Sequence, residues 1–195
     1  MELEIRKLTP EYAADYVKFF DETPHDDGVD EEKCYCVCWC NKDCEGVDFT
    51  SREKRRSLAA KYVEENAIQG YLAYHRNRAI GWCNANTKSD CLKCVSWRAF
   101  MRDIPTGESE PEIKIKSIYC FTITPEMKKQ GVATRLLERV CEDAALDGFD
   151  LVEVYPDKTY TELGGFAGVT EMYAKAGFIV YYETDKKYIM RKKLR

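Results

Sequence analysis

One short segment restricts the fold of this chain more than any other. Residues 118–123, Ile-Tyr-Cys-Phe-Thr-Ile, are an apolar run typical of a buried strand, and Pro125 ends it. A basic turn follows. Gly131 then opens a predicted helix whose inward-facing positions are apolar: Val132, Leu136, Leu137 and Val140. The chain therefore contains a strand–turn–helix unit.

The turn of this unit is a candidate anion site. The first turn of a helix has free backbone N–H groups and carries the positive end of the helix dipole. Gly131 lets a phosphate approach the backbone, and Lys128 and Lys129 add positive charge at the same place. A glycine-containing turn alone is weak evidence, so the interpretation needs a second element.

That second element begins 42 residues after Gly131 with Tyr173-Ala174-Lys175-Ala176-Gly177-Phe178, the end of a short helix that leads into a strand. Together the two segments resemble the acetyl-CoA signature of the GNAT superfamily of N-acyltransferases. The first resembles its (Arg/Gln)-x-x-Gly-x-(Gly/Ala) loop, and the second its Tyr-x-x-x-Gly-Phe helix end. This chain has Lys128 where the family usually has Arg or Gln, so a cation is retained there.

The whole order of predicted elements, β-α-α-β-β-β-α-β-α-β-β, resembles the GNAT acyltransferase fold from end to end. The resemblance implies an α/β (α+β) fold with a central mixed, mostly antiparallel sheet of about seven strands flanked by about four helices. The predicted segments are 3–7, 9–21, 51–66, 70–74, 79–86, 114–124, 130–147, 151–155, 169–176, 178–183 and 187–192. We expect a single GNAT N-acetyltransferase domain over residues 1–195, with an acidic, cysteine-rich loop at 22–47 and an insertion at 87–113 before the cofactor strand.

The resemblance also implies how acetyl-CoA, as co-substrate, would bind. The backbone of the turn would hold the pyrophosphate, and the preceding strand would pair with the pantetheine arm. The family's bulge would separate this strand from the next one, at 151–155, so that the thioester lies in the gap. Backbone N–H groups near 120–122 would stabilise the oxyanion. The expected cofactor-binding residues are Phe121, Thr122, Ile123, Lys128, Lys129, Gln130, Gly131, Val132, Ala133 and Thr134.

Acyl transfer to an amine also needs a base for the amine and an acid for the departing thiolate. Tyr173 aligns with the tyrosine that is the general acid in many GNAT members, and its alternative role is packing behind 177–178. Glu153 is a carboxylate within an apolar strand, where burial without a partner favours a role as base. Alternatively, it faces solvent or pairs with a lysine. His25 and His75 lie in polar loops and are weaker candidates, and a water chain ending on backbone carbonyls would also suffice.

The ten cysteines raise the question of metal or redox chemistry. Cys91 and Cys94 form a Cys-x-x-Cys pair, and five more cluster upstream: Cys34, Cys36, Cys38, Cys40 and Cys44. Two such groups could form a zinc site or a redox pair. The alternation of the cluster instead has the period of a strand, and free cysteine is often buried. We therefore expect reduced thiols and no metal. Trp39, among these cysteines, either lines an acceptor pocket or packs the loop.

Charge and hydropathy exclude several classes of protein. A net charge of −4 disfavours nucleic-acid binding, which needs a basic face. The first residues are too charged for a signal peptide, and no apolar run approaches the roughly 18 residues of a membrane span. We expect a cytoplasmic protein that binds neither nucleic acid nor membrane. Seven acidic residues between Asp21 and Glu32 form either a solvated loop or a rim that attracts a cationic amine.

The sequence thus predicts an acetyl-CoA-dependent N-acetyltransferase in which a primary amine attacks the thioester directly. The acceptor, a small-molecule or protein amine, is not identified, and the resemblance also allows a homodimer built on the C-terminal strands. Two alternatives stay open: a non-catalytic acyl-CoA-binding sensor, and a zinc- or redox-responsive protein built on the cysteine cluster.

Overall fold

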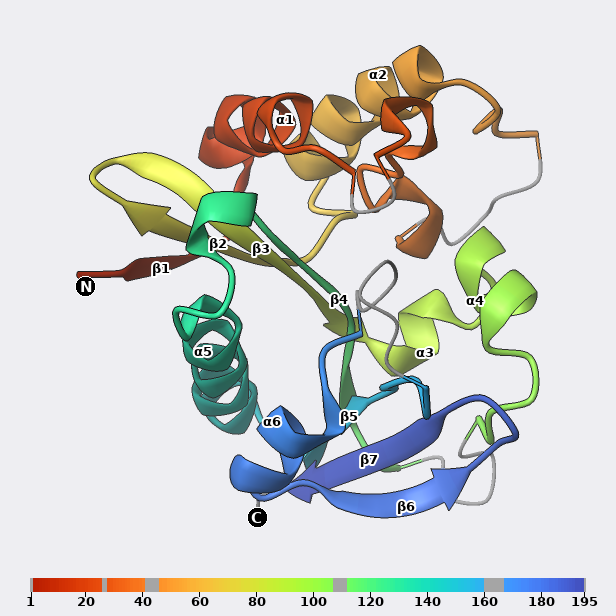
Figure 1. Ribbon diagram of the computed structural model, residues 1–195. Coiled ribbons are helices and arrows are strands. Elements are labelled where there is room, and N and C mark those ends of the chain that lie inside the picture. Colours follow the sequence, from red (N-terminus) through yellow and green to blue (C-terminus); the bar gives the residue numbers. More distant parts are fainter. Residues whose placement is uncertain (1, 26–27, 41–45, 107–111, 160–166, 195) are drawn as a thin grey trace.

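A computed structural model describes residues 2–25, 28–40, 46–106, 112–159 and 167–194. These residues form one seven-stranded mixed sheet with helices on both faces, so the expected α/β fold is confirmed (Figure 1). In chain order the elements are β1 (Glu4–Lys7), the 3₁₀ helix η1 (Pro10–Tyr12), α1 (Ala13–Glu22), η2 (Asp30–Glu32), η3 (Val37–Trp39), α2 (Arg52–Glu64), β2 (Gly70–His75), β3 (Arg78–Thr87), α3 (Lys88–Cys91), α4 (Val95–Phe100), β4 (Ile115–Ile123), η4 (Pro125–Met127), α5 (Val132–Leu146), β5 (Leu151–Val154), α6 (Thr170–Lys175), β6 (Ile179–Glu183) and β7 (Tyr188–Lys193).

The sheet divides at the boundary between β4 and β5. The strand order is β1-β2-β3-β4-β5-β7-β6, and β4–β5 is the parallel pair among antiparallel neighbours. This pair runs from Ile115↔Leu151 to Ile118↔Val154, and the remainder of β4 has no β5 partner. The β3–β4 register also shifts, because Asn84 pairs with Cys120 whereas Ala85 pairs with Ile118. Tyr119 is therefore the extra residue of a bulge in β4. Immediately beyond Ile118, β4 separates from β5.

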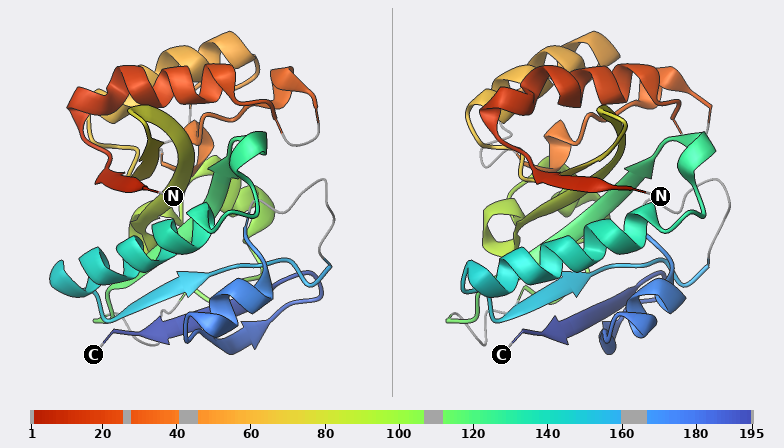
Figure 2. Two further views of the ribbon diagram at one scale, coloured as in Figure 1. Left: turned by 60° about the vertical axis from the view of Figure 1, so that its left-hand side comes forward. Right: turned by 90° about the vertical axis from the view of Figure 1, so that its left-hand side faces the viewer.

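Amphipathic helices cover the two faces of the sheet. The α1–α2 pair packs on one face of the β1–β3 half, and α5 packs on the other face (Figures 1 and 2). The side chains of Leu136, Leu137 and Val140 are fully buried, as their spacing predicts. None of the helices within the described ranges is both long and apolar enough to cross a membrane.

Serine and threonine are favoured at helix N-caps, and such residues stand at two helix starts in this chain, Ser51 and Thr9. The Ser51 Oγ accepts the Lys54 N–H at 3.3 Å, so Ser51 caps α2. Thr9 is not a cap of this kind, because its hydroxyl makes no capping hydrogen bond and instead donates to the Glu11 carboxylate.

The 87–113 insertion contains two helices, α3 and α4, that the sequence analysis did not predict. Trp97, Met101 and Ile104 are buried in a cluster with Tyr119 and Tyr155, so the hydrophilic stretch carries a small core of its own. Helices of four and six residues are too short for hydrophobic periodicity to reveal.

The described part of the cysteine-rich loop is irregular, and its alternating cysteines do not form a strand. Residues 34–40 form turns and η3, and Tyr35 and Cys36 have φ angles of 46° and 51°. Both residues are fully buried. Left-handed backbone at two consecutive non-glycine residues is unfavourable, so surrounding packing must hold this conformation. Cys44 lies outside the described residues.

Candidate active site

The turn before α5 has the backbone geometry of an anion site. Lys129 and Gly131 have φ angles of 60° and 82°, and no side chain caps the helix at Gly131. The Arg135 N–H donates to the Gly131 C=O, which leaves the N–H groups of 132–134 without partners in the helix. A Cβ on Gly131 would meet no described atom within 4 Å, so the space beside this backbone is open. The helix begins at Val132, slightly later than the predicted residue 130.

Neighbouring residues make this turn basic and hold it against the sheet. Lys128 and Lys129 are exposed, and the Gln130 side chain donates back to the Glu126 C=O at 2.6 Å. Val132 packs on β3 at Gly81, where an added Cβ would lie 3.0 Å from the Val132 Cγ1. The glycine therefore permits the close approach that brings the helix start to the end of β4.

The open edge of β4 faces the gap between β4 and β5. The Thr124 N–H donates to the Ile80 C=O at 3.0 Å, and the antiparallel register is regular from there to the Asn84↔Cys120 pair. Hydrogen-bonding direction alternates along a strand, so the backbone groups of Phe121 and Ile123 point away from β3, into the gap. The N–H groups of Cys120 and Thr122 point toward β3. Of the oxyanion donors expected at 120–122, only the Phe121 N–H therefore faces the gap.

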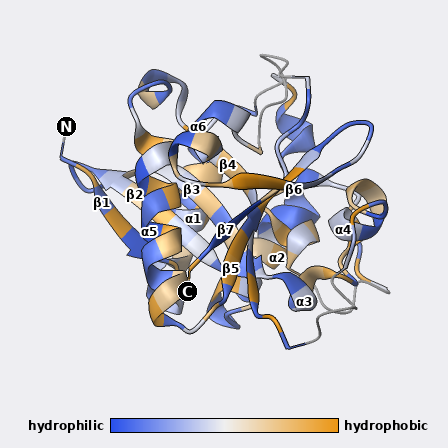
Figure 3. Cartoon of the chain, turned by 90° about the horizontal axis from the view of Figure 1, so that it is seen from below, coloured by the Kyte–Doolittle hydropathy of each residue, from blue (hydrophilic) through white to orange (hydrophobic). Residues whose placement is uncertain are grey.

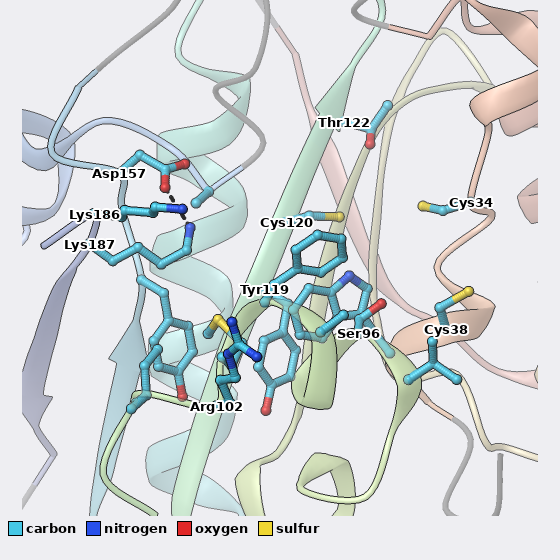
Figure 4. A pocket seen from close by; sticks show the side chains of 18 of the residues that line it. Cys34, Cys38, Ser96, Arg102, Tyr119, Cys120, Thr122, Asp157, Lys186 and Lys187 are labelled. Atoms are coloured by element: carbon cyan, nitrogen blue, oxygen red, sulfur yellow. Dashed lines mark hydrogen bonds and ion pairs between the residues drawn. The ribbon is translucent and has the colours of Figure 1, made fainter. Parts of the chain in front are cut away.

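A cavity of about 1320 Å³ opens beside this gap. The segment after α1, the insertion, β4 and the β6–β7 turn all contribute to its walls (Figure 4). Cys120 and Thr122 line it from β4, and the thiols of Cys34 and Cys120 point toward one another (Figure 4). Its position beside the strand gap makes it the candidate acceptor pocket.

Three stacked rings form one wall of this cavity. The Trp39 ring lies 4.6 Å from Tyr119 at 12°, and Tyr119 lies 5.6 Å from Tyr155 at 4°. The Trp97 ring stands perpendicular to both tyrosines. Trp39 therefore both lines the cavity and packs its loop, which combines the two roles considered for it.

Tyr173 lies in the hydrophobic core behind the cavity. Its side chain is fully buried, its ring contacts Phe178 at 5.5 Å, and its hydroxyl donates to the Ala167 C=O. Ala167 lines the cavity whereas Tyr173 does not, so the hydroxyl lies one residue behind the wall. Burial raises the pKa of Tyr173 well above its usual value, which keeps the phenol protonated.

Glu153 is buried within a network of hydrogen bonds and ion pairs. One carboxylate oxygen accepts from the Lys88 ammonium at 2.6 Å and from the Tyr155 hydroxyl at 2.7 Å, and the other accepts from Arg191 at 2.6 Å. The carboxylate does not line the cavity. It is thus paired with a lysine, as one of the sequence-based alternatives held, and with an arginine as well. Burial lowers the pKa of Lys88 against the opposing attraction of Glu153.

The two expected catalytic residues are not brought together. Val152 and Val154 belong to the same buried cluster as Tyr173. Side chains alternate along a strand, so Glu153, between these valines, points to the opposite face of the sheet. Of the two histidines, His25 lines the cavity, whereas His75 is the last residue of β2 and contacts the Glu2 C=O.

The cysteines in the described parts of the chain are all free thiols, and no three His, Cys, Asp or Glu residues there are grouped to hold a metal ion. The Cys36 and Cys120 sulfurs lie 3.4 Å apart, and the Cys91 thiol donates to the Trp39 C=O at 3.1 Å. Burial raises the pKa of the Cys40 thiol, and a neighbouring thiol together with burial raises that of Cys36. These thiols are therefore protonated at neutral pH.

Much of the acidic run is engaged by cations within the protein. Asp21 pairs with Arg56 at 2.8 Å, and Asp30 pairs with Lys33 at 3.0 Å. Of its described members, Glu32 alone lines the cavity. Residues 26–27 lie outside the described ranges. The run therefore contributes little negative charge to the described cavity wall.

Several site residues escaped the sequence analysis. The sequence analysis assigns no role to Tyr119 and Tyr155, which lie within predicted strands, or to Lys88 and Arg191. The resemblance implied a bulge in this strand but did not give the bulged residue, so the position of Tyr119 beside Tyr155 was not predicted. The one available signal was Glu153, because a carboxylate in an apolar strand requires buried partners.

Comparison with known proteins supports the fold described above. A family model described as the acetyltransferase (GNAT) family matches residues 9–178. A search of curated proteins finds no match.

Among similar solved structures is an acetyltransferase of the GNAT family from Streptococcus pneumoniae, with 17% identity, a TM-score of 0.53 and coverage of 98% of this chain and 99% of that chain. An N-acetyltransferase from Staphylococcus aureus Mu50 has 11% identity, a TM-score of 0.55 and full coverage of both chains. PaiA N-acetyltransferase from Thermoplasma acidophilum, solved with coenzyme A, has 15% identity, a TM-score of 0.51 and 99% coverage of each chain. At these identities the likeness shows a shared fold.

Proposed function

Because the chain belongs to the acetyltransferase (GNAT) family, we propose that it transfers the acetyl group of acetyl-CoA to a primary amine by direct attack. The amine nitrogen forms a bond to the carbonyl carbon, the carbon–sulfur bond breaks, the amine loses a proton and the departing thiolate gains one. The observation that carries the proposal is the uncapped start of α5 beside the open edge of β4.

In this proposal, the two open backbone segments hold acetyl-CoA. The pyrophosphate lies against the free N–H groups of 132–134, near Lys128 and Lys129, where the helix dipole favours negative charge. The pantetheine arm pairs with the outward backbone groups of Phe121 and Ile123. The Phe121 N–H then donates to the oxyanion that forms as the amine attacks.

Tyr173 is the proposed general acid. Burial keeps its phenol protonated. Its hydroxyl donates to the carbonyl of Ala167, a residue that lines the cavity, so only Ala167 separates the hydroxyl from the cavity. To protonate the thiolate, the hydroxyl must exchange the Ala167 carbonyl for the sulfur, which requires a local shift of 167–168. The packing role of Tyr173 behind Phe178 is compatible with this function.

The identity of the base depends on whether Glu153 can give up its partners. Accepting a proton would disrupt two buried ion pairs, with Lys88 and Arg191. This cost favours a positioning role, in which Glu153 holds Tyr155 in the cavity wall and Lys88 at the start of the insertion. We propose that a chain of water molecules, which ends on backbone carbonyl groups, takes the proton from the amine. Glu153 is the alternative base, and substitution of Glu153 tests it.

Titration with acetyl-CoA tests the binding part of the proposal. Gly131→Ala adds a methyl group in the open space where the pyrophosphate would lie, so affinity should fall at least about tenfold. Gly148→Ala, just beyond the C-terminal end of α5, is the matched control, because Gly148 has a φ of 80° against 82° for Gly131. Equal affinities for the two variants would contradict the assignment of the turn.

A non-catalytic acyl-CoA-binding sensor is the second candidate function. It is favoured because both carboxylate oxygens of Glu153 are already hydrogen-bonded, which makes Glu153 a poor base. It predicts tight acetyl-CoA binding without acetylation of any amine.

We also propose a cytoplasmic homodimer. The side chains of the edge strand β6 include four exposed large residues, Ile179, Val180, Tyr181 and Tyr182, so this edge is suited to pairing with a second copy. Figure 3 shows the hydropathy of β6 along the cartoon. Sedimentation of the purified protein tests the homodimer.

A further inference from the structure

The cavity wall is unusually aromatic. Of the 32 described residues that line it, seven are aromatic, against 12% in the whole chain, so the enrichment is about twofold. These residues are Phe20, Trp39, Phe49, Phe100, Tyr119, Tyr155 and Tyr182.

The aromatic wall begins where the thioester is expected. Tyr119 and Tyr155 are the first residues beyond the last β4–β5 pair, Ile118↔Val154, so they lie at the closed end of the gap. Trp39 extends their stack into the cavity. A group attached to the attacking amine would therefore lie against these rings.

In the part of the chain that the structure describes, the buried wall of the cavity offers no carboxylate as a counterion to an ammonium group. The cations Lys33 and Arg55 are buried, and each is already bound within the protein: Lys33 to Asp30 and the Asp21 C=O, and Arg55 to three backbone carbonyls. Among the described residues, every carboxylate that lines the cavity is at least partly exposed at its rim: Glu32, Asp103, Asp157, Glu183 and Asp185. A polycationic amine would thus lose hydration at the inner wall without gaining a partner.

The rings also do not form a cage for a cation. Such a cage needs ring faces directed at one point. Here the faces of Trp39, Tyr119 and Tyr155 largely cover one another, at interplanar angles of 12° and 4°. What remains available is the outer face of the stack and the ring edges, which suit a further flat ring in stacked or edge-to-face contact.

Building on the function proposed above, we propose that the acceptor is a small primary amine that carries an aromatic ring, an arylalkylamine. Trp39 is its specificity-determining contact. Trp39 is half-buried, whereas Tyr119 and Tyr155 are almost wholly enclosed, so Trp39 has the most accessible ring of the stack.

A panel of amines tests the proposal. Release of coenzyme A from acetyl-CoA is followed with 2-phenylethylamine, tryptamine, butylamine, spermidine and a short peptide with a free N-terminus. The arylalkylamines should exceed butylamine and spermidine in kcat/KM by about tenfold or more. Binding of each amine to the protein loaded with coenzyme A is measured in parallel by calorimetry.

Substitutions locate the effect. Trp39→Leu should reduce the preference for arylalkylamines over butylamine to about threefold or less. The change should lie in KM for the amine, with acetyl-CoA affinity unchanged, and Trp39→Phe should retain the preference. The control is Phe149→Leu, since Phe149 is also half-buried but packs in the cluster that includes α5, away from the cavity. If Trp39→Leu does not fold, Trp39→Phe and the wild-type panel still decide.

The outcomes separate this inference from the function on which it depends. Preference for spermidine or for the peptide, with intact acetyl-CoA binding, overturns the acceptor class and leaves the transferase. The acceptor class is also overturned if the protein binds acetyl-CoA but neither binds nor acetylates the arylalkylamines. Failure to bind acetyl-CoA overturns the proposed function, and the acceptor class with it.

Discussion

Replacing Glu153 by glutamine removes a charge from the interior while nearly preserving the volume of the side chain. The Glu153 carboxylate has no exposed surface and accepts from Lys88, Tyr155 and Arg191 at 2.6–2.7 Å. Glutamine retains one acceptor oxygen and turns an NH₂ donor toward one of the two cations. Breaking a buried ion pair from one side typically costs about 3–5 kcal/mol, because the remaining charge is left without a partner.

Urea unfolding at pH 7.5 measures this cost. For a chain of this length, a loss of about 3–5 kcal/mol corresponds to a fall in Tm of roughly 6–20 °C. The matched control is Glu183→Gln, because Glu183 forms a 2.7 Å ion pair with Lys158 and its side chain is 61% exposed. Exposed pairs contribute little, so the control should unfold like the parent. Equal stabilities for the two variants would refute the argument from burial.

The same variant separates the two roles of Glu153 in catalysis. If Glu153 positions Tyr155 and the insertion, KM for the amine should rise more than kcat falls. If it is the base, kcat should fall by about a hundredfold or more with little change in KM. Acetyl-CoA affinity is the internal control and should be unchanged in either case.

Two further predictions follow from buried titratable groups. Lys116 is 5% exposed, and burial is the main cause that lowers its pKa to about 8, from 10.5. Between these pH values Lys116 is protonated in the unfolded chain and neutral in the folded protein, so the free energy of unfolding should rise with pH from about 8 to 10.5. In urea unfolding, Lys116→Met should remove that rise and should be more stable than the parent at pH 7 by up to about 3 kcal/mol. Tyr173→Phe should lower kcat by about a hundredfold with unchanged acetyl-CoA affinity. Because burial raises the pKa of Tyr173, this acid should stay protonated up to about pH 10. If the parent enzyme lost turnover below pH 10 because its acid was deprotonated, Tyr173 would not be that acid.

Local patterns were sufficient to predict most of the fold. The apolar spacing of α5, the Ser51 cap of α2 and the β-α-β order at Gly131 each depend on residues close in sequence, and the structure contains all three. The cysteine-rich loop has a conformation that the alternation of its cysteines did not indicate, because positive φ at Tyr35 and Cys36 is incompatible with an extended strand. Its conformation depends on packing against other segments, which one sequence does not display.

The backbone elements around the site could be predicted, because the strand, the turn at 128–134 and the following helix have a local signature. The role of this turn in binding acetyl-CoA stays a prediction. The aromatic wall and the Glu153 network join positions far apart in the chain: Trp39 meets Tyr119, and Lys88 meets Glu153 and Arg191. Such contacts arise from the bulge and the insertion, whose placement the sequence pattern does not specify.

Calorimetric titration of the reduced protein with acetyl-CoA tests the central claim most directly. The account predicts one-to-one binding with a micromolar Kd, weakened at least about tenfold by Gly131→Ala and unchanged by Gly148→Ala. Absence of binding up to about 1 mM, an affinity weaker than roughly −4 kcal/mol, would contradict the account. The family fold would then be present without its co-substrate site.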